Sequence, residues 1–188
     1  VEGVAFADGE LVRGEFKRAA EATAQLGESL SAEISAQMRV WAEQHVFVLD
    51  QLEALQRGKL RSKLRGRLDL KRLALAGHCY GGVAALETVL LRPVVRAALV
   101  QNAWPLSAAV VKRQLGELPL LAVYSQFGVS AEHLLAQGIP EAQIAKLQQP
   151  YHEKRRAALA GLTEDALELT IEGAGHMSFS DIATVVPW

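Results

Sequence analysis

Apolar side chains before residue 57 recur at alternating steps of four and three residues. From Ile34 onward they stand at Met38, Trp41, Val48, Leu52 and Leu55, with His45 on the same stripe. This spacing is that of one buried face of an α-helix. The pattern predicts mostly helix over about residues 14–57, ending near Gly58. On such a stripe we interpret His45 as a packed core histidine with a satisfied ring, rather than as a ligand or a base.

Short apolar runs bounded by turn residues predict four strands, at residues 73–76, 97–101, 118–124 and 167–172. A helix is predicted at residues 82–91, closed by Pro93, and helical or loop segments at residues 141–149 and 152–160. Strands that alternate with helices in this way pair in parallel through right-handed crossovers. The sequence therefore predicts an α/β fold, with a mostly parallel sheet and helices on both faces.

Residues 1–188 are predicted to form a single domain, because no repeat, low-complexity tract or linker divides them. Half of the residues are hydrophobic, which is enough for a core. The 20 basic and 21 acidic side chains nearly cancel, so neither nucleic acid nor an anionic membrane is indicated as the main partner. No run of about 18 apolar residues is present, so no membrane span is predicted. The single cysteine is consistent with a reducing compartment such as the cytoplasm.

One local exception to this charge balance lies between Arg57 and Arg72. Basic residues also stand at positions 59, 61, 63, 65, 67 and 71, with leucines at 60, 64, 68 and 70. Such a strip could meet an anionic surface or a phosphorylated ligand. A solvated basic surface that leads into the next strand is the favoured interpretation.

Residues 77–82 read Gly-His-Cys-Tyr-Gly-Gly and follow the apolar run of residues 73–76 directly. A strand that ends in a sharp turn and enters a helix at once presents one side chain above the sheet, and glycines flank it because the turn is tight. This is the nucleophile-elbow pattern of an α/β-hydrolase, with the chain's only cysteine, Cys79, in the exposed position. We expect Cys79 to be the nucleophile, with its thiolate favoured by the N-terminus of the following helix.

Acyl transfer also needs a base and donors for the developing oxyanion. The main-chain N–H of Tyr80, directly after the nucleophile, is one expected oxyanion donor. His176 is the candidate base, because it lies late in the chain on a loop that follows the last predicted strand. The remaining histidines fit less well: His78 belongs to the elbow, and His133 and His152 lie in polar segments. We interpret those three as having no chemical role.

Three motifs in the same order together resemble the platelet-activating factor acetylhydrolase family, of the plasma and type II intracellular kind. They are the elbow at residues 77–82, Gln-Asn-Ala-Trp-Pro-Leu at residues 101–106, and Gly-His-Met-Ser-Phe-Ser-Asp at residues 175–181. The likeness covers about residues 14–181. It implies an α/β-hydrolase that cleaves short or oxidised acyl esters through a Ser-Asp-His triad, with no metal and no cofactor.

Two triad positions depart from the family's pattern. Cys79 replaces the serine, and Asn102 stands where the family's aspartate lies. In a serine triad, asparagine in place of the aspartate costs on the order of 10⁴ in rate, whereas a Cys-His-Asn set works on an unrelated protease fold. The two changes are therefore coherent as a set, in which Asn102 orients the imidazole of His176. The predicted function is hydrolysis or transfer of an acyl group from a small-molecule ester, thioester or lactone.

Two other hypotheses stay open. A catalytically inactive homologue that acts as a binding or scaffolding protein would carry the same pair of replacements. In addition, the four predicted strands all begin at or after the elbow, so they make half of the family's sheet and leave its first edge bare. We therefore expect the chain to be the C-terminal portion of a larger domain, completed either by the N-terminal part of that domain or by a partner chain.

Overall fold

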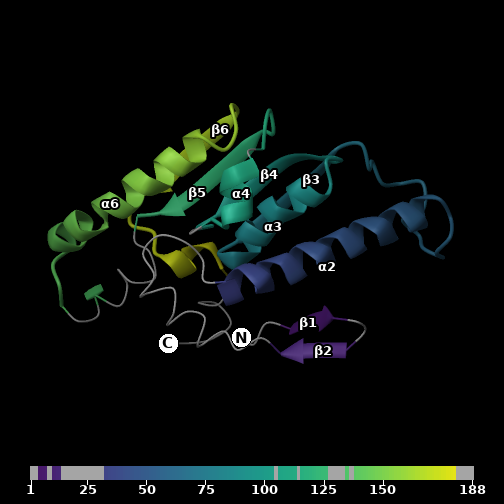
Figure 1. Cartoon of the computed structure of the whole chain (residues 1–188), viewed down its shortest axis with the longest axis horizontal. Helices are drawn as coiled ribbons and strands as arrows, with labels where there is room; N and C mark the ends of the chain where they lie inside the picture. The colour runs from purple at the N-terminus through teal and green to yellow at the C-terminus, as the bar shows by residue number, and fades with distance from the viewer. Residues whose placement is uncertain are drawn as a thin grey trace.

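The centre of the fold is a four-stranded parallel sheet in the order β3-β4-β5-β6 (Figure 1). Its strands are β3 (Leu73–His78), β4 (Val95–Gln101), β5 (Leu120–Ser125) and β6 (Ala166–Ile171). All three strand pairs are parallel. The four predicted strands and the α/β fold class are thus confirmed, and β3 forms one edge of this sheet as the sequence predicts.

The computed structural model describes residues 4–7, 10–13, 32–103, 106–113, 115–126, 134–135 and 138–180. Its helices are α2 (Ala32–Gln56), α3 (Tyr80–Leu91), α4 (Ala108–Arg113) and α6 (Glu141–Ala160), followed by the 3-10 helix η1 (His176–Phe179). Within the described residues no helix is both long and apolar enough to cross a bilayer.

Helix α2 confirms the second part of the predicted long helix, whereas residues 14–31 of that prediction lie outside the described residues. The helix ends where Gly58 adopts a φ of 78°, and the N–H of Lys59 then closes back onto the carbonyl of Ala54 at 2.9 Å. His45 faces α3, where its Nδ1 donates to Thr88 Oγ1 at 2.9 Å. Because the Thr88 hydroxyl proton goes to the carbonyl of Ala84, the threonine oxygen is the acceptor. The interpretation of His45 as a satisfied, packed histidine is confirmed.

Helix α6 corrects the prediction of two separate segments, because it runs without a break through Pro150. A proline inside a helix removes one hydrogen bond and crowds the preceding turn. Ile144 before the proline and Leu159 after it are both buried. Packing therefore holds both halves of α6 against the protein and outweighs the local cost.

A separate antiparallel hairpin, β1 (Val4–Ala7) with β2 (Glu10–Arg13), precedes α2. The sequence analysis placed no strand there. The signal was present, because Asp8-Gly9 between two short apolar stretches is typical of a two-residue hairpin turn. This hairpin does not join the parallel sheet, so it leaves the edge at β3 unpaired among the described residues.

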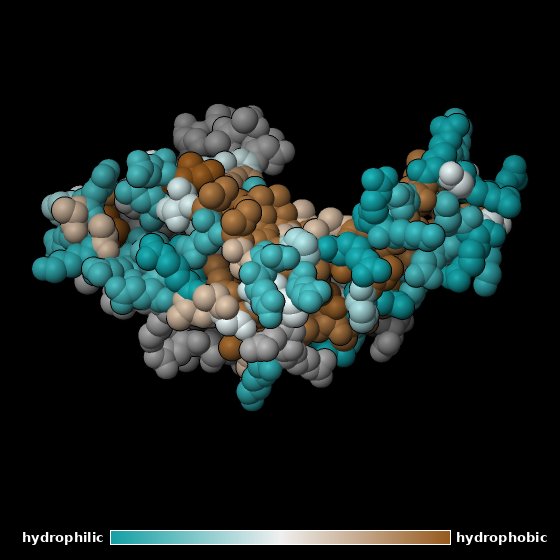
Figure 2. Space-filling model, turned by 90° about the horizontal axis from the view of Figure 1, so that it is seen from above, coloured by the Kyte–Doolittle hydropathy of each residue, from teal (hydrophilic) through white to brown (hydrophobic). Residues whose placement is uncertain are grey.

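The two faces of the parallel sheet differ sharply in burial. The described helices lie on one side of the sheet (Figure 1), where Val100, Ala122 and Tyr124 are buried. On the other side of β6, Leu167 and Leu169 are 70% and 54% exposed. Figure 2 shows hydrophobic surface gathered in the middle of the molecule, between two more polar ends. The second helical layer that the sequence predicts is therefore not among the described residues.

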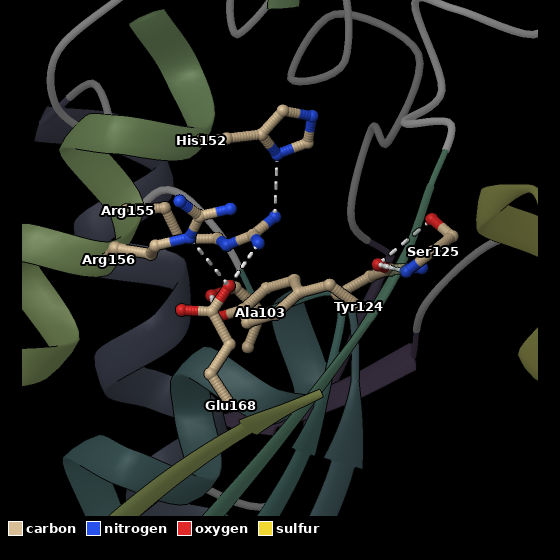
Figure 3. Close-up of polar contacts among 8 residues, drawn as sticks. Ala103, Tyr124, Ser125, His152, Arg155, Arg156 and Glu168 are labelled. Atoms are coloured by element: carbon tan, nitrogen blue, oxygen red, sulfur yellow. Dashed lines mark hydrogen bonds and ion pairs between the residues drawn. The ribbon is translucent and has the colours of Figure 1, made fainter. Parts of the chain in front are cut away.

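A buried cation fastens α6 to the covered face of the sheet. The guanidinium of Arg155, whose side chain is 1% exposed, forms an ion pair with Glu168 on β6 and lies 3.7 Å from the ring centroid of Tyr124 on β5 (Figure 3). Its Nη1 also donates to His152 Nδ1 at 3.1 Å. Arg156 lies further out, with its Nε 3.9 Å from Glu168. The charge of Arg155 is thus matched by one carboxylate and one aromatic face.

We predict that Glu168→Gln lowers the free energy of unfolding by about 3 kcal/mol, because it leaves the buried Arg155 without its counter-charge. The matched control is Glu43→Gln, which removes a carboxylate from the exposed pair with Arg39. That control should lower the same quantity by at most about 0.5 kcal/mol. Urea unfolding followed by circular dichroism measures both, and equal small losses would contradict the role assigned to Arg155.

Candidate active site

Cys79 occupies a strained corner between β3 and α3. Its φ of 56° and ψ of −128° lie in a region that side chains other than glycine rarely adopt. The ladder of β3 and β4 holds it there, because the N–H of Cys79 donates to the carbonyl of Gln101 at 2.8 Å. The carbonyl of Cys79 in turn accepts the N–H of Val83 in the first turn of α3. The predicted strand-turn-helix elbow is therefore present.

Close backbone contacts explain the glycines of this elbow. A Cβ at Gly77 would lie 2.4 Å from the main-chain carbon of Gly81, and a Cβ at Gly82 would lie 2.7 Å from the Cβ of Ala103. Neither distance is compatible with a side chain. Gly77 allows β3 to approach α3, and Gly82 allows α3 to approach the end of β4.

The thiol of Cys79 is less exposed than the sequence predicts. The residue is partly buried and packs against the hydrophobic core. Burial raises the pKa of the thiol, and the main-chain N–H of Tyr80 opposes this with a smaller lowering. The expected helix N-terminus effect is thus present in direction, but desolvation outweighs it and favours the neutral thiol. The Tyr80 N–H is within hydrogen-bonding reach of the sulfur in this structure.

Asn102 follows β4 directly and is buried with a φ of 49°, a left-handed conformation that asparagine tolerates. Its own N–H donates to the carbonyl of Val123 at 2.9 Å. Its Oδ1 accepts from the N–H of Ser125 at 2.9 Å and from the hydroxyl of Ser125 at 3.1 Å. Its Nδ2 donates to the main-chain carbonyl of His176 at 3.4 Å. Asn102 therefore links the ends of β4 and β5 to the loop that carries His176.

His176 begins η1 and is buried. Its carbonyl accepts a second hydrogen bond, from His78 Nε2 at 3.1 Å, so His78 must carry its proton on Nε2. The rings of His78 and His176 also lie 4.6 Å apart between centroids. Two side chains, His78 and Asn102, thus hold the same carbonyl and fix the His176 loop against the elbow.

The arrangement differs from the predicted triad in its contacts. Among the described residues, Asn102 bonds the main chain of His176 and not its imidazole, and no hydrogen bond joins the Cys79 sulfur to that ring. The expectation that Asn102 orients the imidazole directly is replaced by a tether through the main chain. The three residues nevertheless come from the same edge of the sheet, where β3, β4 and β6 end.

His78 is the residue that sequence reasoning missed. The sequence pattern indicates only a residue of the elbow with no chemical role, yet the His78 ring lies against the His176 ring and donates a hydrogen bond to the His176 carbonyl. The sequence did contain a signal for His78, because it stands next to Cys79 at the sheet edge that the His176 loop must also reach. His152 lies on α6 beside Arg155, and His133 lies outside the described residues.

Burial and a neighbouring imidazole make His176 a neutral ring at pH 7. Desolvation is the larger cause and the charge of His78 the smaller, and together they lower the pKa of His176 to about 4. Burial also lowers the pKa of His78. No cluster of histidine, cysteine and acidic residues suited to a metal ion occurs in the described part of the chain. The chemistry available here is that of a neutral thiol beside neutral imidazoles.

Comparison with protein families matches residues 46–188 to one family, described as platelet-activating factor acetylhydrolase, isoform II. The chain belongs to this family. The match includes the C-terminal part of α2, the elbow and the His176 loop, so it confirms the family resemblance. A search of curated proteins gave no match.

Solved structures support the same fold. A ferulic acid esterase from Streptomyces cinnamoneus superposes with a TM-score of 0.60 and is 23% identical in sequence. The match covers 97% of the present chain and 43% of the esterase. At this identity the likeness establishes the α/β-hydrolase fold alone, and the chain spans less than half the length of that structure.

The lowered histidine pKa values predict loss of stability in acid. Between about pH 6.5, the ordinary histidine value, and about pH 4 the unfolded chain binds protons that folded His176 does not. The free energy of unfolding should therefore fall as pH decreases through this window. Urea titrations of the wild type and of His176→Gln measure it, and the variant should show the shallower pH dependence. Parallel curves would contradict the buried neutral state of His176.

Proposed function

We propose that the protein hydrolyses or transfers the acyl group of a small-molecule ester, thioester or lactone, with Cys79 as the nucleophile and His176 as the base. The observation that carries this proposal is the strained elbow that holds Cys79 with the Tyr80 N–H at its sulfur. Membership of an acetylhydrolase family supports an acyl substrate. The esterase with the same fold is a weaker support, because fold by itself does not choose a substrate.

The protonation states define how such a step runs. At pH 7 the thiol and the imidazole of His176 are both neutral, so there is no resting thiolate-imidazolium pair. The sulfur attacks the acyl carbonyl carbon while its proton passes to His176, and the oxyanion forms at the Tyr80 N–H. His176 then gives the proton to the leaving alcohol or thiol as the bond between the acyl carbon and the leaving oxygen or sulfur breaks. Water or another acceptor finally cleaves the thioester to Cys79, with His176 as general base.

The Cys79 sulfur and the His176 ring must approach one another for this transfer. In many enzymes without substrate the catalytic hydrogen bonds are long and tighten only in the complex. The main chain of His176 is already tethered beside the elbow by His78 and Asn102. We therefore assign Asn102 and His78 as positioning residues, which act on the acyl chemistry only through His176.

The uncovered face of the sheet supports a further part of the proposal. Leu167, Leu169 and Ile171 are 70%, 54% and 46% exposed on β6, and edge strand β3 has no partner beyond β4 among the described residues. Contiguous apolar surface of this kind marks a place where other polypeptide packs. We propose that additional polypeptide, either from the same domain or from a partner chain, covers this face and completes the oxyanion site.

A non-catalytic binding or scaffolding role is the second candidate. It is favoured by the burial that keeps the Cys79 thiol neutral and by the contact of Asn102 with the His176 main chain instead of its ring. On this hypothesis the elbow and the loop survive as a rigid frame, and the protein neither turns over esters nor forms an acyl-enzyme.

We predict that the chain cleaves activated esters or thioesters and that Cys79→Ala reduces this turnover to background, because the variant has no nucleophile.

Iodoacetamide should label Cys79 slowly at neutral pH and faster at alkaline pH, since burial raises the pKa of the thiol. Mass spectrometry of intact protein gives the labelling rate, with the urea-unfolded chain as reference. An inert thiol together with no turnover would favour the scaffold.

The tether to His176 generates a kinetic prediction. Asn102→Ala and His78→Phe should each lower kcat by about tenfold to a hundredfold with little change in KM, because each loosens the base without touching the substrate. Since both side chains hold one carbonyl, the double variant should lose less than the product of the two single losses. Steady-state kinetics on an activated thioester measures all three.

His45→Phe is the matched histidine control for this series. It removes the hydrogen bond to Thr88 between α2 and α3 and should leave kcat unchanged, since Thr88 lies about two turns along α3 from the elbow. Full independence of the Asn102 and His78 effects would show that they do not act through the same carbonyl. A rise in KM alone would instead place one of them at the substrate.

A further inference from the structure

The segment that joins α2 to β3, residues 57–72, forms a basic lobe at one end of the molecule. It carries eight lysine and arginine side chains and one carboxylate, Asp69. In Figure 1 this lobe lies at the right, where β3 begins, and the same end of Figure 2 is mostly hydrophilic. The elbow lies at the other end of β3. The lobe is therefore a surface distinct from the candidate active site.

Most of the positive charge in the basic lobe is not neutralised within the described part of the chain. Arg72 pairs with Asp69, and Arg57 pairs with Glu53 on α2. No ion pair is recorded there for the other six cations, at positions 59, 61, 63, 65, 67 and 71. Like charges held together without counter-charges repel one another, and an anionic surface relieves that repulsion.

The basic lobe is folded back on α2, so its cations are presented from an ordered backbone. The N–H of Lys59 donates to the carbonyl of Ala54 at 2.9 Å, and the N–H of Gly66 donates to Gln56 Oε1 at 3.0 Å. A further main-chain bond joins Arg67 to Leu64 at 3.0 Å. These hydrogen bonds hold the cations and the leucines of the lobe on one ordered segment of backbone.

Two exposed leucines in the lobe favour a lipid bilayer over a nucleic acid as its partner. Leu60 and Leu64 are 41% and 49% exposed, and every residue from 59 to 67 is exposed. Phosphate groups of a nucleic acid would satisfy the cations but would leave both leucines in water. A bilayer with anionic headgroups satisfies both kinds of side chain, because apolar groups enter the boundary between headgroups and acyl chains.

We propose that the basic lobe docks the protein on an anionic lipid bilayer, with its free cations on the headgroup phosphates and with Leu60 and Leu64 inserted at the interface. The six residues of β3 separate the lobe from Cys79, a span of roughly 20 Å. Docking in this way leaves the edge that carries Cys79 facing the aqueous phase. An acyl substrate would then enter from solution and not from the bilayer.

Sedimentation of the 188-residue chain with phosphatidylcholine vesicles, with and without phosphatidylglycerol, tests this proposal. Binding is expected only to the anionic vesicles and should weaken as salt is raised. The double variant Lys59→Gln/Lys63→Gln should bind roughly tenfold more weakly or worse. The matched control Lys112→Gln/Lys146→Gln removes the same charge from exposed positions on α4 and α6 and should bind as the wild type does.

A second variant, Leu60→Ser/Leu64→Ser, keeps every charge and should weaken vesicle binding by about tenfold because it removes the inserted apolar groups. Circular dichroism confirms that each variant is folded. Equal binding to neutral vesicles, equal loss in the lysine control, or no anionic binding by the wild type would overturn the proposal. Tighter binding to short duplex DNA, unaffected by the leucine changes, would replace it with a nucleic-acid surface.

Discussion

The close approach of β3 and α3 at residues 77–82 is the constraint on which the rest of the molecule depends. Without side chains at Gly77 and Gly82 the strand can turn into the helix within a residue, and the ends of β3 and β4 come into contact with α3. The strained φ of Cys79 is a consequence of this turn. The same turn places His78 beside Cys79 on the edge where the chain returns after β6, and there His78 contacts His176.

Electrostatics at this edge is governed by burial and not by charge pairs. The raised pKa of Cys79 and the lowered pKa of His176 have the same main cause, which is loss of water around each group. Asn102 contributes hydrogen bonds without charge, since its oxygen holds Ser125 and its nitrogen holds the carbonyl of His176. A cysteine suits such a neutral site better than a serine, because a thiol gives up its proton far more readily than a hydroxyl.

Three surfaces around the sheet differ in chemistry: the face covered by helices, the uncovered face and the basic lobe. One face is sealed by helices, with Arg155 as the buried link between α6 and the sheet. The other face leaves the leucines of β6 exposed to water, and the additional polypeptide proposed above would bury them. The basic lobe projects at the end opposite the elbow. The proposed active site and the proposed docking surface therefore lie at opposite ends of β3.

Local pattern in the sequence determined the four parallel strands, the elbow, the end of α2 at Gly58 and the candidates Cys79 and His176, whereas the candidate Asn102 came from the family resemblance. These features depend on neighbours within a few residues, on periodicity and on glycine geometry. Only the tertiary structure decided the burial of the thiol, the continuity of α6 through Pro150, the contact of His78 with His176 and the contact of Asn102 with a carbonyl instead of a ring. Each of these depends on atoms far apart in the chain, whose packing no local pattern records.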